Sequence, residues 1–144
     1  MVPTMSANPL VRYQRLSKAR RVLLPRAITA LAAASVAVAL FPFRKAIRFG
    51  SIELRRPTGV SSHDIEWAIE AASRHMPLRI VCLQKGLAAQ RMLRTAGIDA
   101  RLHYGARHEP ASRDLKAHVW VTVAGRPVIG GEEAVGFATV ATLP

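Results

Sequence analysis

Two residues of this chain have the types and the positions that nucleophilic catalysis requires. Cys82 is the single cysteine, and it lies where the pattern predicts the start of a helix. The free backbone amides and the positive end of a helix favour a thiolate at such a position. His118 belongs to an apolar run that predicts a strand, from which an imidazole can take the thiol proton and later give it to a leaving amine.

Taken singly, each residue also has a structural interpretation. Cys82, between Val81 and Leu83, has the setting of a buried small hydrophobe, and His118 has that of a hydrogen-bonded core histidine. A single cysteine excludes an internal disulfide framework and a zinc site of the Cys-x-x-Cys type. The other four histidines, at positions 63, 75, 103 and 108, show no metal-ligand spacing. We therefore expect neither a metal nor a cofactor.

The elements that must position these residues are predicted within residues 57–144. A helix over 63–75 follows the hydroxyl caps Ser61 and Ser62 and stops at Met76-Pro77, and a second runs from Ile80 or Cys82 to about residue 96, before Gly97. Strands are predicted over 98–105, 117–123 and 126–129, with a polar loop over 107–116 and a tight turn at 124–125. This order predicts an α+β fold, with helices packed on one face of a small antiparallel sheet.

The basic charge of the chain is concentrated before residue 57. Of the 144 residues, 21 are Lys or Arg and 9 are Asp or Glu, for a net charge of +12. Residues 1–56 hold 11 of the basic side chains and a single acid, whereas residues 57–144 hold 10 basic and 8 acidic groups. The second segment is nearly neutral, so the sequence gives little support to a nucleic-acid binder.

Residues 1–56 predict a basic, partly apolar helical region that caps the domain at 57–144. The pattern indicates a basic amphipathic helix over 12–24, an apolar helix over 28–40 and a short piece over 43–49. The uncharged run at 27–43 is 17 residues, just short of a membrane span. A secretory signal with a cleavage site at Ala37-Val38-Ala39 is the alternative. The favoured prediction is a cytoplasmic protein whose arginines contact an acidic partner or weakly bind a membrane surface.

Three stretches together resemble a known family. They are residues 77–88 (PLRIVCLQKGLA), 93–102 (LRTAGIDARL) and 117–121 (AHVWV). They are similar to the cysteine protease of lasso peptide biosynthesis, a transglutaminase-like, papain-like enzyme known as the B2 or leader-peptidase component. The resemblance covers about residues 57–144, and the segment 40–44 (LFPFR) is similar to the helical lead-in of that family.

The resemblance implies a hydrolase that cleaves a ribosomally made precursor peptide between leader and core. Cys82 would be the nucleophile and His118 the general base and acid. It further implies a separate leader-recognition protein as partner, because residues 1–56 lack the strand pattern of a fused recognition domain. A macrolactam cyclase would then use the freed core peptide.

The acidic third member of such a site is the point at which this chain departs from the family pattern. The expected aspartate position corresponds to Gly130, and a two-residue turn at 124–125 would place Gly131 opposite His118. Glu132 is the first candidate to orient the imidazole, and Glu133 is the alternative. Asp114, in the preceding loop, is a weaker substitute, and a Cys-His dyad is also compatible with the sequence.

Two other functions remain open at this level. One is a non-catalytic adaptor that binds a peptide or a membrane and buries Cys82. The other is an acyl-transfer enzyme on the same scaffold, which would pass the acyl group to an amine in place of water.

Overall fold

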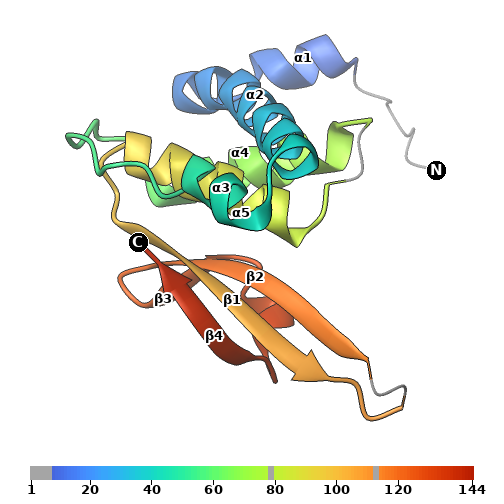
Figure 1. Cartoon of the computed structure of the whole chain (residues 1–144). Coiled ribbons are helices and arrows are strands. Elements are labelled where there is room, and N and C mark those ends of the chain that lie inside the picture. The colour runs from blue at the N-terminus through green and yellow to red at the C-terminus, as the bar shows by residue number, and fades with distance from the viewer. Residues whose placement is uncertain (1–7, 78–79, 112–113) are drawn as a thin grey trace.

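A computed structural model describes residues 8–77, 80–111 and 114–144. Figure 1 shows a helical layer above a four-stranded antiparallel sheet, with α1 and α2 farthest from the sheet and α3, α4 and α5 between them and the strands. Residues 78 and 79 of the family-like stretch, and residues 112 and 113 of the expected polar loop, lie outside the described residues.

One long helix replaces the two helices expected in the N-terminal region. After the short α1 (Pro9–Gln14), α2 runs from Lys18 to Leu40 and passes through Pro25 without a break. A proline inside a helix cannot donate to the carbonyl four residues before it, here that of Arg21. The hydroxyl of Tyr13 donates to the Arg21 carbonyl at 2.6 Å and supplies the missing bond. The predicted break was wrong because α1 folds back to satisfy this position.

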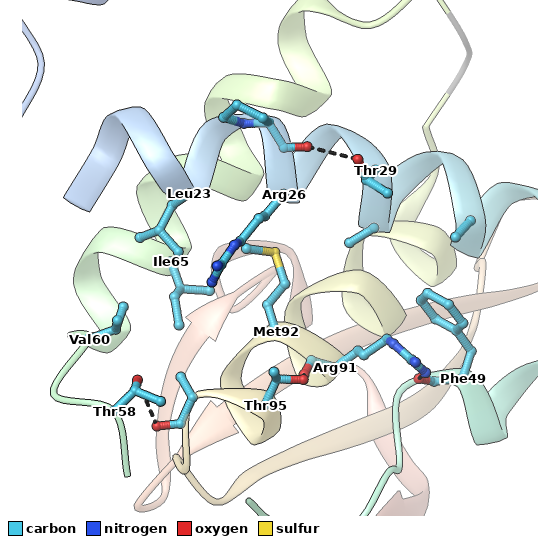
Figure 2. A pocket seen from close by; sticks show the side chains of 14 residues that line it. Leu23, Arg26, Thr29, Phe49, Thr58, Val60, Ile65, Arg91, Met92 and Thr95 are labelled. Carbon is cyan, nitrogen blue, oxygen red and sulfur yellow. Dashed lines mark hydrogen bonds between the residues drawn. The ribbon is translucent and has the colours of Figure 1, made fainter. Parts of the chain in front are cut away.

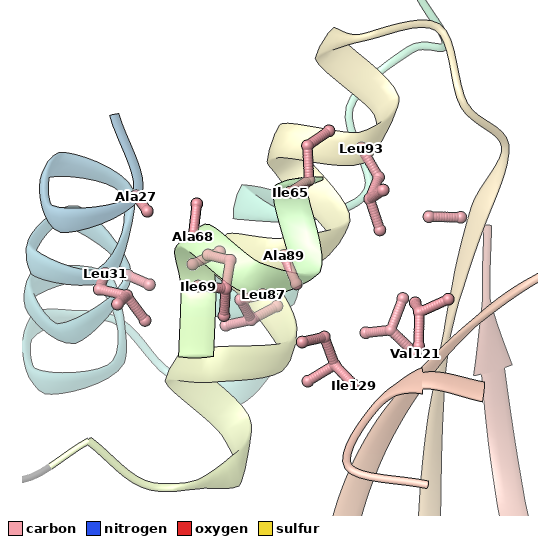
Figure 3. Packing of buried hydrophobic residues seen from close by; sticks show 14 of the residues in the cluster. Ala27, Leu31, Ile65, Ala68, Ile69, Leu87, Ala89, Leu93, Val121 and Ile129 are labelled. Carbon is pink, nitrogen blue, oxygen red and sulfur yellow. The ribbon is translucent and has the colours of Figure 1, made fainter. Parts of the chain in front are cut away.

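The inner side of α2 is part of the core of the molecule. Leu23, Ala27, Leu31 and Ala34 are at most 5% exposed, and they pack in one hydrophobic cluster with residues of α4 and α5. Figure 3 shows this cluster running from α2 through α4 and α5 to the sheet. Four small or branched residues at helical spacing give α2 a buried stripe, which fixes it along the helical layer.

A polar contact also joins α2 to α4 (Ser62–His75). The Arg20 guanidinium donates to the Asp64 carboxylate at 3.0 Å and lies 4.7 Å from the ring centroid of Trp67. This hydrogen bond holds the pKa of Asp64 below its ordinary value, against the opposing effect of burial. The ionised carboxylate therefore stabilises the helix pair above the ordinary pKa of an aspartate, and this contribution is lost as the pH falls through the lowered pKa.

The second helix of the predicted domain is α5 (Cys82–Thr95), so the helix begins at the cysteine. It is reached after α3 (Phe43–Ala46), the 3₁₀ turn η1 (Ile47–Phe49), an extended segment and α4. Both predicted helices, 63–75 and the one ending near residue 96, are confirmed. Ser61 accepts from the Asp64 amide at 3.1 Å, which is the hydroxyl cap that the sequence indicated.

The sheet has the order β3-β2-β1-β4, with every neighbouring pair antiparallel. Its strands are β1 (Ala100–His108), β2 (Leu115–Val123), β3 (Arg126–Ile129) and β4 (Ala138–Leu143). The turn at 124–125 and the pairing of Val123 with Arg126 are confirmed. The first two strands extend into the expected loop, because β1 and β2 pair as far as His108 and Leu115.

The fourth strand was not predicted. β4 is an edge strand whose residues, Ala138 to Leu143, are almost all exposed, so its sequence carries no alternation of apolar and polar residues. Backbone pairing with β1 holds it in the sheet. The register between β2 and β3 also shifts by one residue between Val121 and Thr122, which the simple hairpin prediction did not include.

Gly97 ends α5 and provides the sharpest test of this fold. Its φ of +81° is unfavourable for any other residue, and an added Cβ would lie 2.5 Å from Pro57 N, on the segment that passes beneath the helix end. We expect Gly97→Ala to lower the free energy of unfolding by about 3 kcal/mol, since strain and a backbone clash add. Urea denaturation measures this value.

Gly59→Ala is the matched control for this prediction. Gly59 has nearly the same φ, +80°, but no atom of the described residues lies within 4 Å of an added Cβ. That variant should lose only about 1 kcal/mol, the cost of the backbone conformation alone. Equal losses in the two variants would contradict a packing role for Gly97.

Candidate active site

Cys82 occupies the first position of α5, and its side chain is partly buried against the hydrophobic core. The Gln84 side chain turns back and accepts from the Val81 amide at 3.2 Å, which closes the start of the helix. The amides of residues 82–84 precede the first helical hydrogen bond, which Lys85 donates to Val81. Cys82 therefore belongs to a helix start whose first amides have no helical partner, and such amides can hold an oxyanion.

A glycine brings this end of α5 close to the sheet. Gly86 lies one turn after Cys82 on the same helix face, and a Cβ added to it would approach Val119 Cγ1 to 2.7 Å and Leu102 Cδ1 to 3.1 Å. Any larger residue would push the helix away from β1 and β2. The Cys82 turn is thus packed toward the strand that carries His118.

His118 is held by a backbone carbonyl. The atom His118 Nε2 lies 2.8 Å from Gly130 O, and only 7% of the residue is exposed. A carbonyl oxygen only accepts, so Nε2 carries the proton and Nδ1 of the neutral ring is the free acceptor. The rings of Trp120 and Phe137 lie near the imidazole, with centroids at 6.0 and 5.5 Å from its own. Nδ1 is therefore the ring nitrogen that is able to accept a proton.

Gly130 stands where the family pattern has an aspartate, and it contacts His118 through its backbone carbonyl. Gly130 has a φ of +71°, and a Cβ there would lie 2.9 Å from Val119 O and 3.2 Å from His118 Nε2. A side chain of any size would enter the space of the imidazole. The carbonyl of Gly130 performs the orienting contact that an acid performs in a triad.

The acids proposed from the sequence lie at the border of this site. Both belong to the 3₁₀ turn η2 (Glu132–Ala134). Glu133 Oε2 is 3.8 Å from His118 Nε2, and its side chain is 76% exposed. Neither Glu132 nor Asp114 forms an ion pair or hydrogen bond with His118 within the described residues. Of the predicted acids, Glu133 is the one that the structure brings near the imidazole.

Cys82 and His118 are related through the packing of α5 on β2, and no hydrogen bond joins the two side chains in the described part of the chain. Side chains alternate along a strand, so His118 and Trp120 share one sheet face and Val119 packs toward α5 on the other. β3 pairs with β2 only from Val121 onward, which leaves the His118 end of β2 at the sheet edge. Catalytic hydrogen bonds are often long before substrate binds. Proton transfer requires Nδ1 and the thiol to meet around this edge.

A depression of about 490 Å³ opens beside His118. It is lined by Arg107, Lys116, Ala117, His118, Glu132, Glu133, Val135 and Phe137. Arg107, Lys116 and Phe137 were not singled out from the sequence. Glu109 lies between the two cations, 2.9 Å from Lys116 Nζ and 3.9 Å from Arg107, and the Lys116 contact holds the pKa of Glu109 below its ordinary value. Arg107 and Lys116 face each other across β1 and β2, a pairing that only the register reveals.

A larger cavity of about 590 Å³ lies in the helical layer, between α2 and the second half of α5. Figure 2 shows Leu23, Arg26 and Thr29 of α2 facing Arg91, Met92 and Thr95 of α5 across it. Its lining includes none of the predicted catalytic residues.

Comparison with known proteins agrees with this architecture. The sequence profile described as the Transglutaminase-like superfamily matches residues 6–142, which is nearly the whole chain. Neither the search of curated proteins nor the search of solved structures gave a match. The predicted α+β transglutaminase-like fold is confirmed, with helices packed on a small antiparallel sheet. The chain belongs to the transglutaminase-like superfamily.

Proposed function

We propose that this protein is a cysteine peptidase that removes the leader from a lasso peptide precursor. The superfamily includes cysteine peptidases and acyltransferases, and the family-like stretches of the sequence favour the leader peptidase. The observation that carries the proposal is the packing of the Cys82 helix, through Gly86, onto the strand of a histidine whose Nε2 is already held by Gly130.

The proposed chemistry gives each of these groups one role. His118 Nδ1 takes the Cys82 proton, and the thiolate attacks the carbonyl of the last leader residue. Amides at the start of α5 stabilise the negative oxygen that develops. His118 then returns the proton to the nitrogen of the first core residue, the peptide bond breaks, and the leader remains as a thioester on Cys82. Water activated by Nδ1 hydrolyses the thioester and restores the thiol.

The proposed reaction needs a substrate and partners that a single chain does not provide. We expect the precursor to be presented by a separate leader-recognition protein, and the freed core amine to be joined to an acidic side chain by a macrolactam cyclase. The assay therefore contains the full chain, the precursor and the recognition protein, with intact-mass measurement of the products.

Isotopic water distinguishes hydrolysis from acyl transfer. In H₂¹⁸O, hydrolysis places one ¹⁸O atom in the new leader carboxylate and leaves the core amine unlabelled. Acyl transfer would instead give a leader joined to an added amine, without ¹⁸O. An intact precursor after prolonged incubation with the partner would contradict both reactions and favour a non-catalytic adaptor.

The acidic residues beside His118 are expected to have a small part in this reaction. Because the Gly130 carbonyl already orients the imidazole, we expect Glu133→Gln to lower kcat/KM by less than about fivefold, the scale of a solvent-exposed ion pair. Glu132→Gln is the matched control and should leave the rate within about twofold. A loss of a hundredfold or more in either variant, measured with the precursor assay, would show that a carboxylate and not the carbonyl completes the site.

A further inference from the structure

The outer side of α2 is an exposed apolar surface. Val22, Ile28, Val36 and Leu40 are 52%, 44%, 54% and 72% exposed, on the side of the helix opposite its buried stripe. The chain continues this surface at Phe41, which is 51% exposed. We call these five residues the α2 outer face. Single exposed apolar residues are ordinary, but a run of this size on one helix marks a contact surface.

Length and hydropathy alone would allow α2 to cross a membrane, since an 18-residue window of this 23-residue helix has a mean hydropathy of 1.9. The packing argues against a spanning position. Leu23, Ala27 and Leu31 belong to the same core cluster as Ile65 and Leu87. Moving α2 into a bilayer would expose that core, so the helix stays on the domain and only its outer side is free.

Basic side chains border the α2 outer face at both ends. Arg12, Arg15 and Lys18 are exposed before it, and Arg44, Lys45 and Arg48 are exposed after it. Ala27 to Phe43 contains no charged residue. Of the basic residues in the described part of 8–56, only Arg20 forms an ion pair, with Asp64. Exposed apolar side chains flanked by cations without ion-pair partners can contact an anionic lipid surface, where the cations pair with phosphates.

We propose that the α2 outer face docks this protein on an anionic lipid surface, with α2 parallel to the membrane plane. Val36, Leu40 and Phe41 enter the boundary between headgroups and acyl chains, and Arg44, Lys45 and Arg48 contact lipid phosphates. Figure 1 shows α2 on the side of the molecule away from the sheet. The strand that carries His118 therefore faces the solvent, where a soluble peptide can reach it. This inference is independent of the proposed function.

The experiment is vesicle flotation of the full chain. Vesicles of phosphatidylcholine with phosphatidylglycerol are compared with vesicles of phosphatidylcholine alone. We expect binding to the anionic vesicles and at least about tenfold weaker binding to the neutral ones. At 1 M salt, binding to the anionic vesicles should fall to the level that the apolar side chains alone provide.

Two variants separate the apolar and the cationic contributions. Val36→Glu/Leu40→Glu should weaken binding to anionic vesicles by at least about tenfold, since two apolar side chains no longer enter the lipid. Arg44→Ala/Lys45→Ala should weaken it by about tenfold to thirtyfold, with no effect on neutral vesicles. The matched controls Val140→Glu and Arg101→Ala alter an exposed valine and an exposed arginine of the sheet, and should bind as the parent does.

Three results would overturn the proposal. The first is the absence of binding to anionic vesicles by a protein whose thermal unfolding is normal. The second is equal loss of binding in the sheet controls, which would mean that overall charge and not this face is responsible. The third is a dimer in light scattering that Val36→Glu/Leu40→Glu dissociates, because a second copy would then cover the face.

Discussion

Cys82→Ala is expected to abolish precursor cleavage, with a fall in kcat/KM of at least about a thousandfold, the scale on which loss of a catalytic nucleophile acts. In the proposed mechanism the thiolate forms the bond to the leader carbonyl, and no second cysteine in the chain can replace it. Intact-mass analysis of the precursor after incubation with the recognition protein measures the effect. Thioester-linked leader on the parent enzyme, absent from the variant, would locate the bond at this residue.

The fold should survive this substitution. Cys82 is only partly buried, and alanine is a strong helix former at the first turn of α5. The thermal unfolding midpoint should therefore change by no more than a few degrees, about the effect of 1 kcal/mol in a domain of this size. Undiminished cleavage by a folded Cys82→Ala protein would remove Cys82 from the mechanism and with it the cysteine peptidase proposal.

His118→Gln is expected to lower kcat/KM by about a hundredfold to ten-thousandfold, the contribution of a positioned general acid and base. Glutamine has an amide group that can donate to the Gly130 carbonyl, as His118 Nε2 does at 2.8 Å, but it has no basic nitrogen in place of Nδ1. The variant therefore separates the proton-transfer role of the ring from its structural hydrogen bond. Urea denaturation should show a loss of less than about 1.5 kcal/mol.

His103→Gln is the matched control for this variant. His103 lies on the same sheet face, stacks on Trp120 at 5.4 Å, and contacts the Thr122 hydroxyl at 2.8 Å and the Thr142 hydroxyl at 3.0 Å. Burial lowers its pKa, and the positive charge of Arg101 lowers it further. We expect this substitution to alter stability and to leave the cleavage rate within about threefold. Equal losses of activity in both histidine variants would mean that the stack around Trp120, and not proton transfer, controls the reaction.

The match between expectation and structure is closest where a local rule acts. A hydroxyl before Asp64 and a glycine after Ala96 specify helix ends through backbone geometry, and both were found within one or two residues of their predicted places. The two elements missed depend on distant residues. α2 is continuous because the Tyr13 hydroxyl donates a hydrogen bond to the Arg21 carbonyl. β4 forms because its backbone pairs with the edge of β1.

The sequence by itself determined the fold class and the two residues with catalytic potential. The reason is that helix caps, strand alternation and the lone thiol at a helix start are local features. Only the tertiary structure decided what lies against the histidine, because β3 ends at Ile129 and the chain turns at Gly130, whose carbonyl lies 2.8 Å from His118 Nε2 while Glu133 stays exposed beside it. Register and long-range pairing arise from packing over the whole sheet, and no single segment encodes them.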